Sequence, residues 1–283
     1  MLPRRKFNWP IGLFFALITL LSALGVWWEF SNFHPATIVL ALVLYLIYGF
    51  SITCYYHRRL THKQFKMARG LEVLMAVCAT GAILLTARKW HRRHDDHHKY
   101  TDNPALDPNC AQPGFWGFWD THVWQVVCSR YQDRPIDQDE AIDAVEVWQE
   151  RLYWPLASFM AILLPVAIAS LWGDATGGLL IACAQRMLMQ YNGAFLVNSA
   201  AHSGVFGEKP GRHWSSATNL AFRGWRLPVA TLFVLMSLGE VLGHEVHHER
   251  PGRWDTGWKW LNPSSILLSL LNRLGLVWEL RTY

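Results

Sequence analysis

The sequence predicts an all-α integral membrane protein with four transmembrane helices. Three observations carry this prediction: apolar runs of membrane-spanning length, a low charge content, and histidines grouped in short boxes outside those runs. The hydrophobic fraction is 52% and the charged fraction 17%, against about 25% charged residues in an ordinary soluble domain. Sixteen tryptophans agree with this class, because tryptophan collects at bilayer interfaces.

Four apolar runs approach the roughly 20 residues that a helix needs to cross a bilayer. They cover residues 11–28, 36–56, 153–172 and 178–197. The fourth run is interrupted by Gln185 and Arg186. We expect one domain over residues 1–283, because the sequence has no linker-like segment and no internal repeat.

The distribution of lysine and arginine predicts which side each polar region occupies. The connections between spans one and two and between spans three and four contain neither residue, whereas the N-terminus carries Arg4, Arg5 and Lys6. By the positive-inside rule, both termini and the regions 57–152 and 198–283 are cytoplasmic. Two shorter apolar stretches, 71–86 and 228–242, are expected to be interfacial or core helices at the cytoplasmic face.

The net charge and the cysteine spacing argue against two other classes of protein: those that bind nucleic acid and those built on disulfides or cysteine-bound zinc. The net charge is +5 and the basic residues form no single stripe, so nucleic acid is not an expected partner. The five cysteines are odd in number and have no CxxC spacing, which argues against a disulfide framework or a cysteine zinc site.

The cytoplasmic histidines form one set. The first box is "HRRLTH", with His57 and His62, and the second, "HRRHDDHH", places His94, His97 and His98 at spacing i, i+3, i+4. "GHEVHHE" repeats that spacing with His244, His247 and His248, and "NSAAH" ends at His202. The spacing puts three rings on one helix face, and neutral imidazole is the commonest metal ligand. Since one metal takes about four to six ligands, this set predicts two metals, although the ligand type does not name the ion.

These boxes, in this order relative to the spans, resemble the integral-membrane fatty acyl desaturases, especially the acyl-CoA Δ9 (stearoyl-CoA type) branch and its bacterial relatives. The resemblance covers roughly residues 36–283 and rests on "HRRLTH", "HRRHDDHHKYTD", "FLVNSAAH" and "HEVHHERPGRWDTGWKW". It implies four transmembrane helices with a cytoplasmic helical cap that holds a dinuclear iron site. The implied iron ligands are His57, His62, His94, His97, His98, His202, His244, His247 and His248, with Asn198 reaching one iron through water.

The resemblance also implies a reaction: O2-dependent introduction of a cis double bond, at Δ9, into a saturated acyl chain bound as acyl-CoA. Unactivated methylenes do not yield to side-chain acids or bases, so the metals carry the hard step. The expected electron donor is a separate ferredoxin, rubredoxin or b-type cytochrome with its reductase. Cations beside the second box could attract a phosphorylated carrier or an acidic redox partner; they are Arg88, Lys89, Arg92, Arg93 and Lys99.

Several residues depart from the family pattern or have open roles. His91 is an extra histidine, His122 matches a family histidine that binds no metal, and Phe195 replaces an expected tunnel tryptophan. Ahead of the last box, "GEVLGH" has three residues between its glutamate and its histidine, where the family usually has two. Glu245 stands where the family usually has an asparagine. Carboxylates that could orient imidazoles are Asp95, Asp96, Asp102, Glu240 and Glu245.

The main alternatives are a membrane diiron hydroxylase and a desaturase that acts on acyl carrier protein or lipid-bound chains. A metal transporter would place its ligands inside the spans, whereas these histidines follow the spans on one side. A heme-carrying membrane cytochrome would show a strong visible absorption band.

Overall fold

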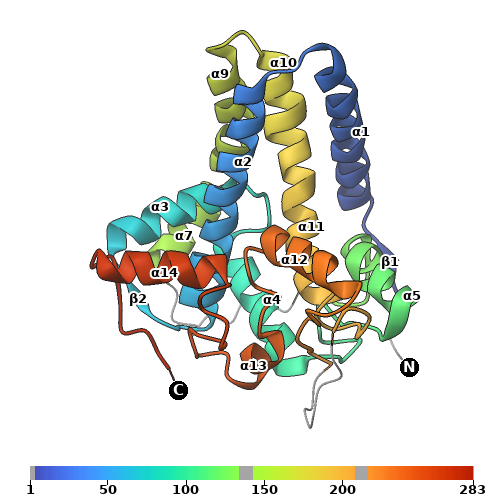
Figure 1. Ribbon diagram of the computed structural model, residues 1–283, viewed down its shortest axis with the longest axis vertical. Helices are drawn as coiled ribbons and strands as arrows, with labels where there is room; N and C mark the ends of the chain where they lie inside the picture. Colours follow the sequence, from blue (N-terminus) through green and yellow to red (C-terminus); the bar gives the residue numbers. More distant parts are fainter. Residues whose placement is uncertain (1–3, 134–142, 208–215, 283) are drawn as a thin grey trace.

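Long helices form a stem, and the remaining elements gather around one end of it (Figure 1). The computed structural model describes residues 4–133, 143–207 and 216–282. The stem helices are α1 (Trp9–Ser31), α2 (Pro35–Phe50) with the π-helical η1 (Ser51–Thr61), α8 (Tyr153–Ser158) with η3 (Phe159–Leu163) and α9 (Leu164–Ser170), and α10 (Ala175–Gly177) with η4 (Gly178–Gln185) and α11 (Arg186–Ser199).

Three of these helices are long and apolar enough to cross a membrane. They are Trp9–Ser31, Pro35–Thr61 and Tyr153–Ser170. The fourth expected span, 178–197, is helical and lies beside the others, but Gln185, Arg186 and Gln190 lower its hydropathy. Only 17% of the apolar window of α1 is buried, so most of its side chains face outward, as lipid-facing side chains do.

Local signals in the sequence start the first two helices. Asn8 caps α1 by accepting a hydrogen bond from the Ile11 amide at 3.2 Å, and Pro10 follows in the first turn. Pro35 begins α2; proline suits this position because its missing N–H would be unsatisfied there in any case. At the far end of the stem, buried Asp174 accepts from the Thr37 hydroxyl at 2.6 Å and caps α10 through the Gly177 amide.

The end of the stem where His57 lies carries shorter elements, called the cap here. Its helices are α3 (Arg69–Thr80), α4 (Ala87–Tyr100), α5 (Gly114–Trp119), η2 (Asp120–Trp124), α6 (Gln125–Val127), α7 (Ala144–Arg151), α12 (Arg226–Met236), α13 (His244–Glu249) and α14 (Pro263–Arg273). The all-α prediction needs a small correction. Two-residue strands pair antiparallel, β1 (Lys6–Phe7) with β3 (Cys128–Ser129) and β2 (Lys66–Met67) with β4 (Val277–Trp278). These pairs connect segments far apart in sequence, which no local pattern encodes.

The two shorter apolar stretches, 71–86 and 228–242, do not form spans. Helix α3 has 12 residues and α12 has 11, about 18 Å or less at 1.5 Å per residue. Both lie across the base of the stem rather than along it (Figure 1). Each buries one side and exposes large apolar residues such as Leu74 and Leu235 on the other, as helices in the plane of a bilayer interface do. The five cysteines are unbridged, as the sequence predicted.

Candidate metal centre

The structure brings the nine histidines of the predicted set together in the cap. They come from η1, the residue after it, α4, the segment after α11, and α13. They form two groups, and within each group one ligand nitrogen per residue lies within 4.8 Å of the others. The first group is His57, His62, His94, His98 and His247, and the second is His97, His202, His244 and His248.

Helices α4 and α13 each contribute to both groups. On α4, His94 and His98 are one turn apart and enter the first group, while His97 enters the second. Helix α13 sends His247 to the first group, and His244 and His248 to the second. The i, i+3, i+4 spacing therefore has a consequence that the sequence did not reveal: each triplet contributes to both groups and so joins them.

The residues that precede α4 and α13 fix where these two histidine-bearing helices begin. Thr86 caps α4 by accepting a hydrogen bond from the Lys89 amide at 3.2 Å. Gly243 precedes α13 with φ +62°, and a Cβ there would lie 2.6 Å from Cβ of Thr256. Only glycine combines that backbone conformation with so close an approach.

Carboxylates and a hydroxyl orient three of the rings. Nδ1 of His57 donates to Oε2 of Glu240 at 2.7 Å, and Nδ1 of His97 donates to Oδ1 of Asp107 at 2.9 Å. Nδ1 of His202 lies 3.0 Å from Oγ of Ser216, whose hydroxyl donates to Asp102 at 2.6 Å. Ligating histidines in metal sites have such partners, which fix the tautomer and ring orientation.

In these rings Nδ1 has a partner, and the remaining ring nitrogen, Nε2, is suited to bind a cation. Once Nδ1 carries the proton, Nε2 of a neutral ring is a lone-pair acceptor. Nε2 of His57 lies 3.0 Å from Nε2 of His247, and Nε2 of His202 lies 2.9 Å from Nε2 of His244. Buried His97 Nε2 has no hydrogen-bond partner among the described residues. Converging lone pairs without donors fit metal ions between them.

The pKa values favour metals over protons in this role. Burial, and then the charges of neighbouring histidines, hold the pKa well below the usual range for six ligand candidates, and the same causes lower the pKa of His244 to about 3. The six are His62, His94, His98, His202, His247 and His248. These rings are therefore neutral near pH 7, the form in which imidazole binds metals.

Of the five carboxylates that the sequence suggested as ring partners, two are seen to support a histidine ring. Glu240 and Asp102 orient rings, directly or through Ser216. Asp95 is exposed, and Asp96 accepts from the Tyr131 hydroxyl at 2.8 Å. Glu245 accepts from Asn219 at 3.0 Å.

Three contributors were missed: Asp107, Ser216 and Trp90. The indole of Trp90 stacks on His94 with ring centroids 4.7 Å apart. Neither Asp107 nor Ser216 lies at a helical spacing from the histidine it serves, so no sequence signal could have found them. Trp90 lies four residues before His94 on the same helix, and that i, i+4 spacing could have indicated the contact.

His91 and His122 lie outside both groups. Nδ1 of His91 lies 3.3 Å from Oε1 of Glu146, on the α7 side of α4. His122 joins η2 to α11 through Ser199 at 2.9 Å and Asn192 at 3.1 Å. Asn198 is half-buried in the last turn of α11, four residues before His202.

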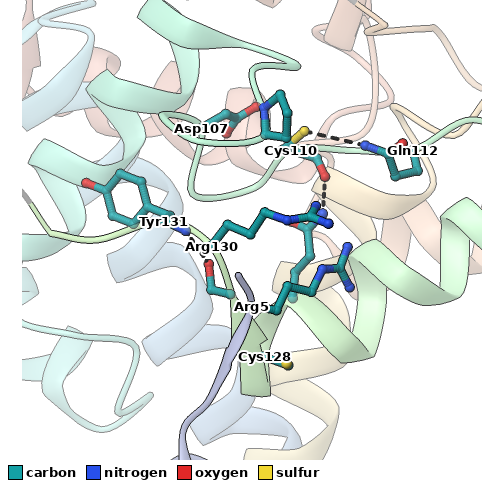
Figure 2. A pocket seen from close by; sticks show the side chains of 10 residues that line it. Arg5, Asp107, Cys110, Gln112, Cys128, Arg130 and Tyr131 are labelled. Atoms are coloured by element: carbon teal, nitrogen blue, oxygen red, sulfur yellow. Dashed lines mark hydrogen bonds between the residues drawn. The ribbon is translucent and has the colours of Figure 1, made fainter. Parts of the chain in front are cut away.

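Three of the five cations beside the second box have local partners that the structure shows. Arg88 pairs with Glu150 at 3.5 Å and Arg93 with Asp133 at 2.9 Å, while Lys99 lies over the Tyr100 ring. A small pocket next to this region is lined by residues that include Arg5, Arg130 and Tyr131 (Figure 2). Asp107 is in its wall, so the carboxylate that orients His97 separates this pocket from the second histidine group.

Comparison with known proteins places the chain in a family. Residues 33–262 match the fatty acid desaturase family. The chain is 30% identical over 286 residues to a probable acyl-CoA desaturase of Schizosaccharomyces pombe, which covers 99% of this chain and 56% of that protein. It is 27% identical over 293 residues to an acyl-CoA Delta-9 desaturase of Acheta domesticus, covering 99% and 76% of the two chains. It is 28% identical over 292 residues to an acyl-CoA Delta(11) desaturase of Trichoplusia ni, covering 99% and 78%.

The chain thus spans about half the length of the fission yeast relative and about three quarters of the two insect relatives. The family match and the similarity to the first relative both extend over most of the 283 residues, including every histidine of the two groups. This chain belongs to the fatty acid desaturase family.

Proposed function

We propose that this protein is an O2-dependent acyl-CoA desaturase that introduces a cis double bond at Δ9 of a saturated acyl chain. The observation that carries the proposal is the pair of adjacent histidine groups, each with its ligand nitrogens within 4.8 Å. Family membership supports it, and so do relatives whose names include acyl-CoA and Delta-9 desaturase.

The proposed ligands of two iron ions are the nine histidines of the two groups. The first group offers five nitrogens and the second four, and Asn198 completes the second through a water, since it lies one helical turn before His202. When bound, the metals supply the oxygen activation that removal of two hydrogens from unactivated methylenes requires. The chain's own residues hold the imidazoles close together, and Glu240, Asp107 and Ser216 orient three of them.

The reaction requires an electron donor. Reduction of O2 to two water molecules takes four electrons, of which the acyl chain supplies two when its C=C bond forms. The remaining two come from a ferredoxin, a rubredoxin or a b-type cytochrome with its reductase. Lys89 and Lys99, which are exposed on α4, favour an acidic partner or a phosphorylated carrier by their charge.

The proposed topology has four spans, with both termini and the cap in the cytoplasm. The three apolar helices and the η4–α11 helix run along the long axis (Figure 1). An even number of crossings returns the chain to the side on which it began. Lysines and arginines lie mostly in the N-terminal and cap segments, which supports a cytoplasmic cap.

Expression in a host that lacks unsaturated fatty acids, followed by chromatographic lipid analysis, tests the activity. We expect new monounsaturated chains, about two iron atoms per chain in the purified protein, and no heme absorption band. His98→Ala removes a ligand of the first group and should abolish the product. His91→Ala is the matched control on the same helix, because His91 faces Glu146 rather than the groups. An alcohol in place of the alkene would identify a hydroxylase, and product on acyl carrier protein or intact lipid would change the substrate class.

A further inference from the structure

A buried arginine in the stem binds the turn formed by residues 81–85, which connects α3 to the histidine-bearing helix α4. Arg186, 1% exposed, opens α11, and its guanidinium donates to three backbone carbonyls. Nη1 reaches the Gly81 carbonyl at 2.8 Å, while Nε and Nη2 reach the carbonyls of Ala182 and Ala161, each at 3.3 Å. Among the described residues no carboxylate contacts it; the ring of Tyr48 lies 4.9 Å away instead.

A second stem residue binds the same turn. The hydroxyl of Tyr191, on α11, donates to the Ile83 carbonyl at 2.8 Å. Arg186 and Tyr191 thus hold the carbonyls of residues 81 and 83, between α3 and α4. Gly81 also leaves room for the ring of Tyr48, because a Cβ there would lie 2.5 Å from Cε2 of Tyr48.

The turn is strained. Ile83 has φ +52° and Leu85 has φ +73°, the left-handed region that non-glycine residues rarely adopt and that is a clear outlier for a β-branched side chain. Such backbone persists only where the surroundings over-determine it, and it concentrates at functional sites. Buried donors aimed at two of its carbonyls are surroundings of that kind.

The turn ends at the start of α4. Thr86 caps that helix, and the amide of the next residue, Ala87, donates to Gln149 at 3.0 Å. Helix α4 then carries His94, His97 and His98, which are divided between the two histidine groups. A change in the path of residues 81–85 would therefore move ligands of both groups relative to His57, which lies on the stem helix η1.

We propose that Arg186 and Tyr191 are positioning residues that hold the left-handed turn and so set α4 in the metal centre. This inference rests on the proposed metal centre but not on the identity of the product. A merely structural role, holding stem helices together, predicts that the two residues act independently of the conformation of the turn. The positioning role predicts that the effect of mutating them on metal binding depends on the strain at Ile83.

A double-mutant cycle separates these roles, with Co²⁺ binding to the metal-free, detergent-solubilised full chain as the readout. Tyr191→Phe removes only the hydroxyl that holds the turn. Ile83→Gly removes the strain, because glycine adopts positive φ at no steric cost. The cycle compares the effect of Tyr191→Phe with Ile83 present and in the Ile83→Gly background, so the general cost of the glycine cancels.

We expect Tyr191→Phe to weaken Co²⁺ binding about tenfold with Ile83 present and less than about twofold in the Ile83→Gly background. The matched control is Tyr45→Phe, which removes a hydroxyl on α2 that donates to the Met236 carbonyl of α12 rather than to the turn; it should change Co²⁺ affinity less than about twofold. Arg186→Lys, run through the same cycle, forms the second arm. An ammonium cannot reproduce the guanidinium's contacts with three carbonyls, so the same dependence on Ile83 is expected.

Equal effects of Tyr191→Phe in both backgrounds, or equal effects of Tyr191→Phe and Tyr45→Phe, would overturn the positioning role. His98→Ala is measured in the same titration and should lose Co²⁺ binding. If His98→Ala bound Co²⁺ as the unmodified protein does, the proposed metal centre itself would be wrong. That result is distinct from failure of the cycle alone, which would leave the centre and the desaturase proposal standing.

Discussion

Nδ1 of His57 lies 2.7 Å from Oε2 of Glu240, and the other oxygen of that carboxylate accepts from Nε of Arg58 at 2.9 Å. All three side chains are buried. Burial alone would raise the pKa of Glu240, but the charges of Arg58 and His57 and the hydrogen bonds from them lower it to about 2. The carboxylate is therefore charged at any physiological pH, and it holds Nδ1 of His57 so that Nε2 faces the first histidine group.

Glu240→Gln should weaken metal binding at the first group. The amide keeps the shape of the carboxylate but loses the charge that orients His57 and compensates Arg58. We expect a loss of about 10- to 100-fold in iron or cobalt affinity, as for other residues that orient ligating histidines. The affinity is measured by titrating the metal-free protein with Co²⁺ and monitoring the absorption of the bound ion. Glu245→Gln, on α13 beside His244, is the control and should retain near-normal affinity, because Glu245 contacts Asn219; equal losses in both variants would refute the role of Glu240.

Asp107→Asn should affect the second group instead. Asp107 is buried, and besides His97 it accepts from the amides of Asp102 and Asn109 at 2.9 and 2.8 Å. Asp107 orients His97 directly and holds Asp102, which supports His202 through Ser216. Because both histidines belong to the second group, we expect the metal content to fall from about two to about one per chain. Elemental analysis of the purified protein gives the ratio. Asp95→Asn, an exposed change on α4, should leave the ratio at two, and an Asp107→Asn protein with two metals would contradict the assignment.

Acid should destabilise the metal-free protein below about pH 6.5. The folded-state pKa of His244 is about 3, whereas an unfolded histidine titrates near 6.5. Between these values the unfolded chain binds the extra proton, so stability is full above pH 6.5 and is lost as pH falls toward 3, by about 1.4 kcal/mol per pH unit for this one group. Thermal unfolding of metal-free protein from pH 8 to pH 5 should show a falling Tm. His244→Gln should reduce the slope, and a flat profile would contradict the buried neutral cluster.

The membrane topology predicts opposite labelling of two engineered cysteines. Ser31 is exposed at the end of α1 and Lys66 is exposed in β2. In a Cys128→Ser background, which removes the one native cysteine that is not buried, a membrane-impermeant maleimide added to intact cells should label Ser31→Cys but not Lys66→Cys. Permeabilised cells should show labelling of both. Labelling of Lys66→Cys in intact cells would place the cap on the outer side.

Local patterns in the chain were enough to predict the helical membrane class and the membership of the histidine set. The apolar runs around residues 11–28, 36–56 and 153–172 correspond to α1, α2–η1 and α8–α9. The i, i+3, i+4 spacing of His94, His97 and His98 anticipated that these rings share a helix. Both signals are short-range, and helical periodicity relates the spacing of residues in the sequence to their positions on a helix.

The long-range relationships were not predictable. The two-residue strand pairs join β1 to β3 and β2 to β4 across more than a hundred residues. Asp107 and Ser216 lie in irregular segments, where residue spacing carries no information about direction. The left-handed conformation at Ile83 runs against the preference of isoleucine and occurs where Tyr191 binds the Ile83 carbonyl and Arg186 binds the Gly81 carbonyl.

The sequence by itself determined that this is a helical membrane protein with a family-specific set of histidines on one side of its spans. The tertiary structure decided how that set divides into five and four, which carboxylates orient the rings, and what holds α4 in place. The physical reason is the range of the interactions involved. Helix formation and membrane insertion depend on neighbours within a few turns, whereas ligand geometry depends on contacts between segments that only packing brings together.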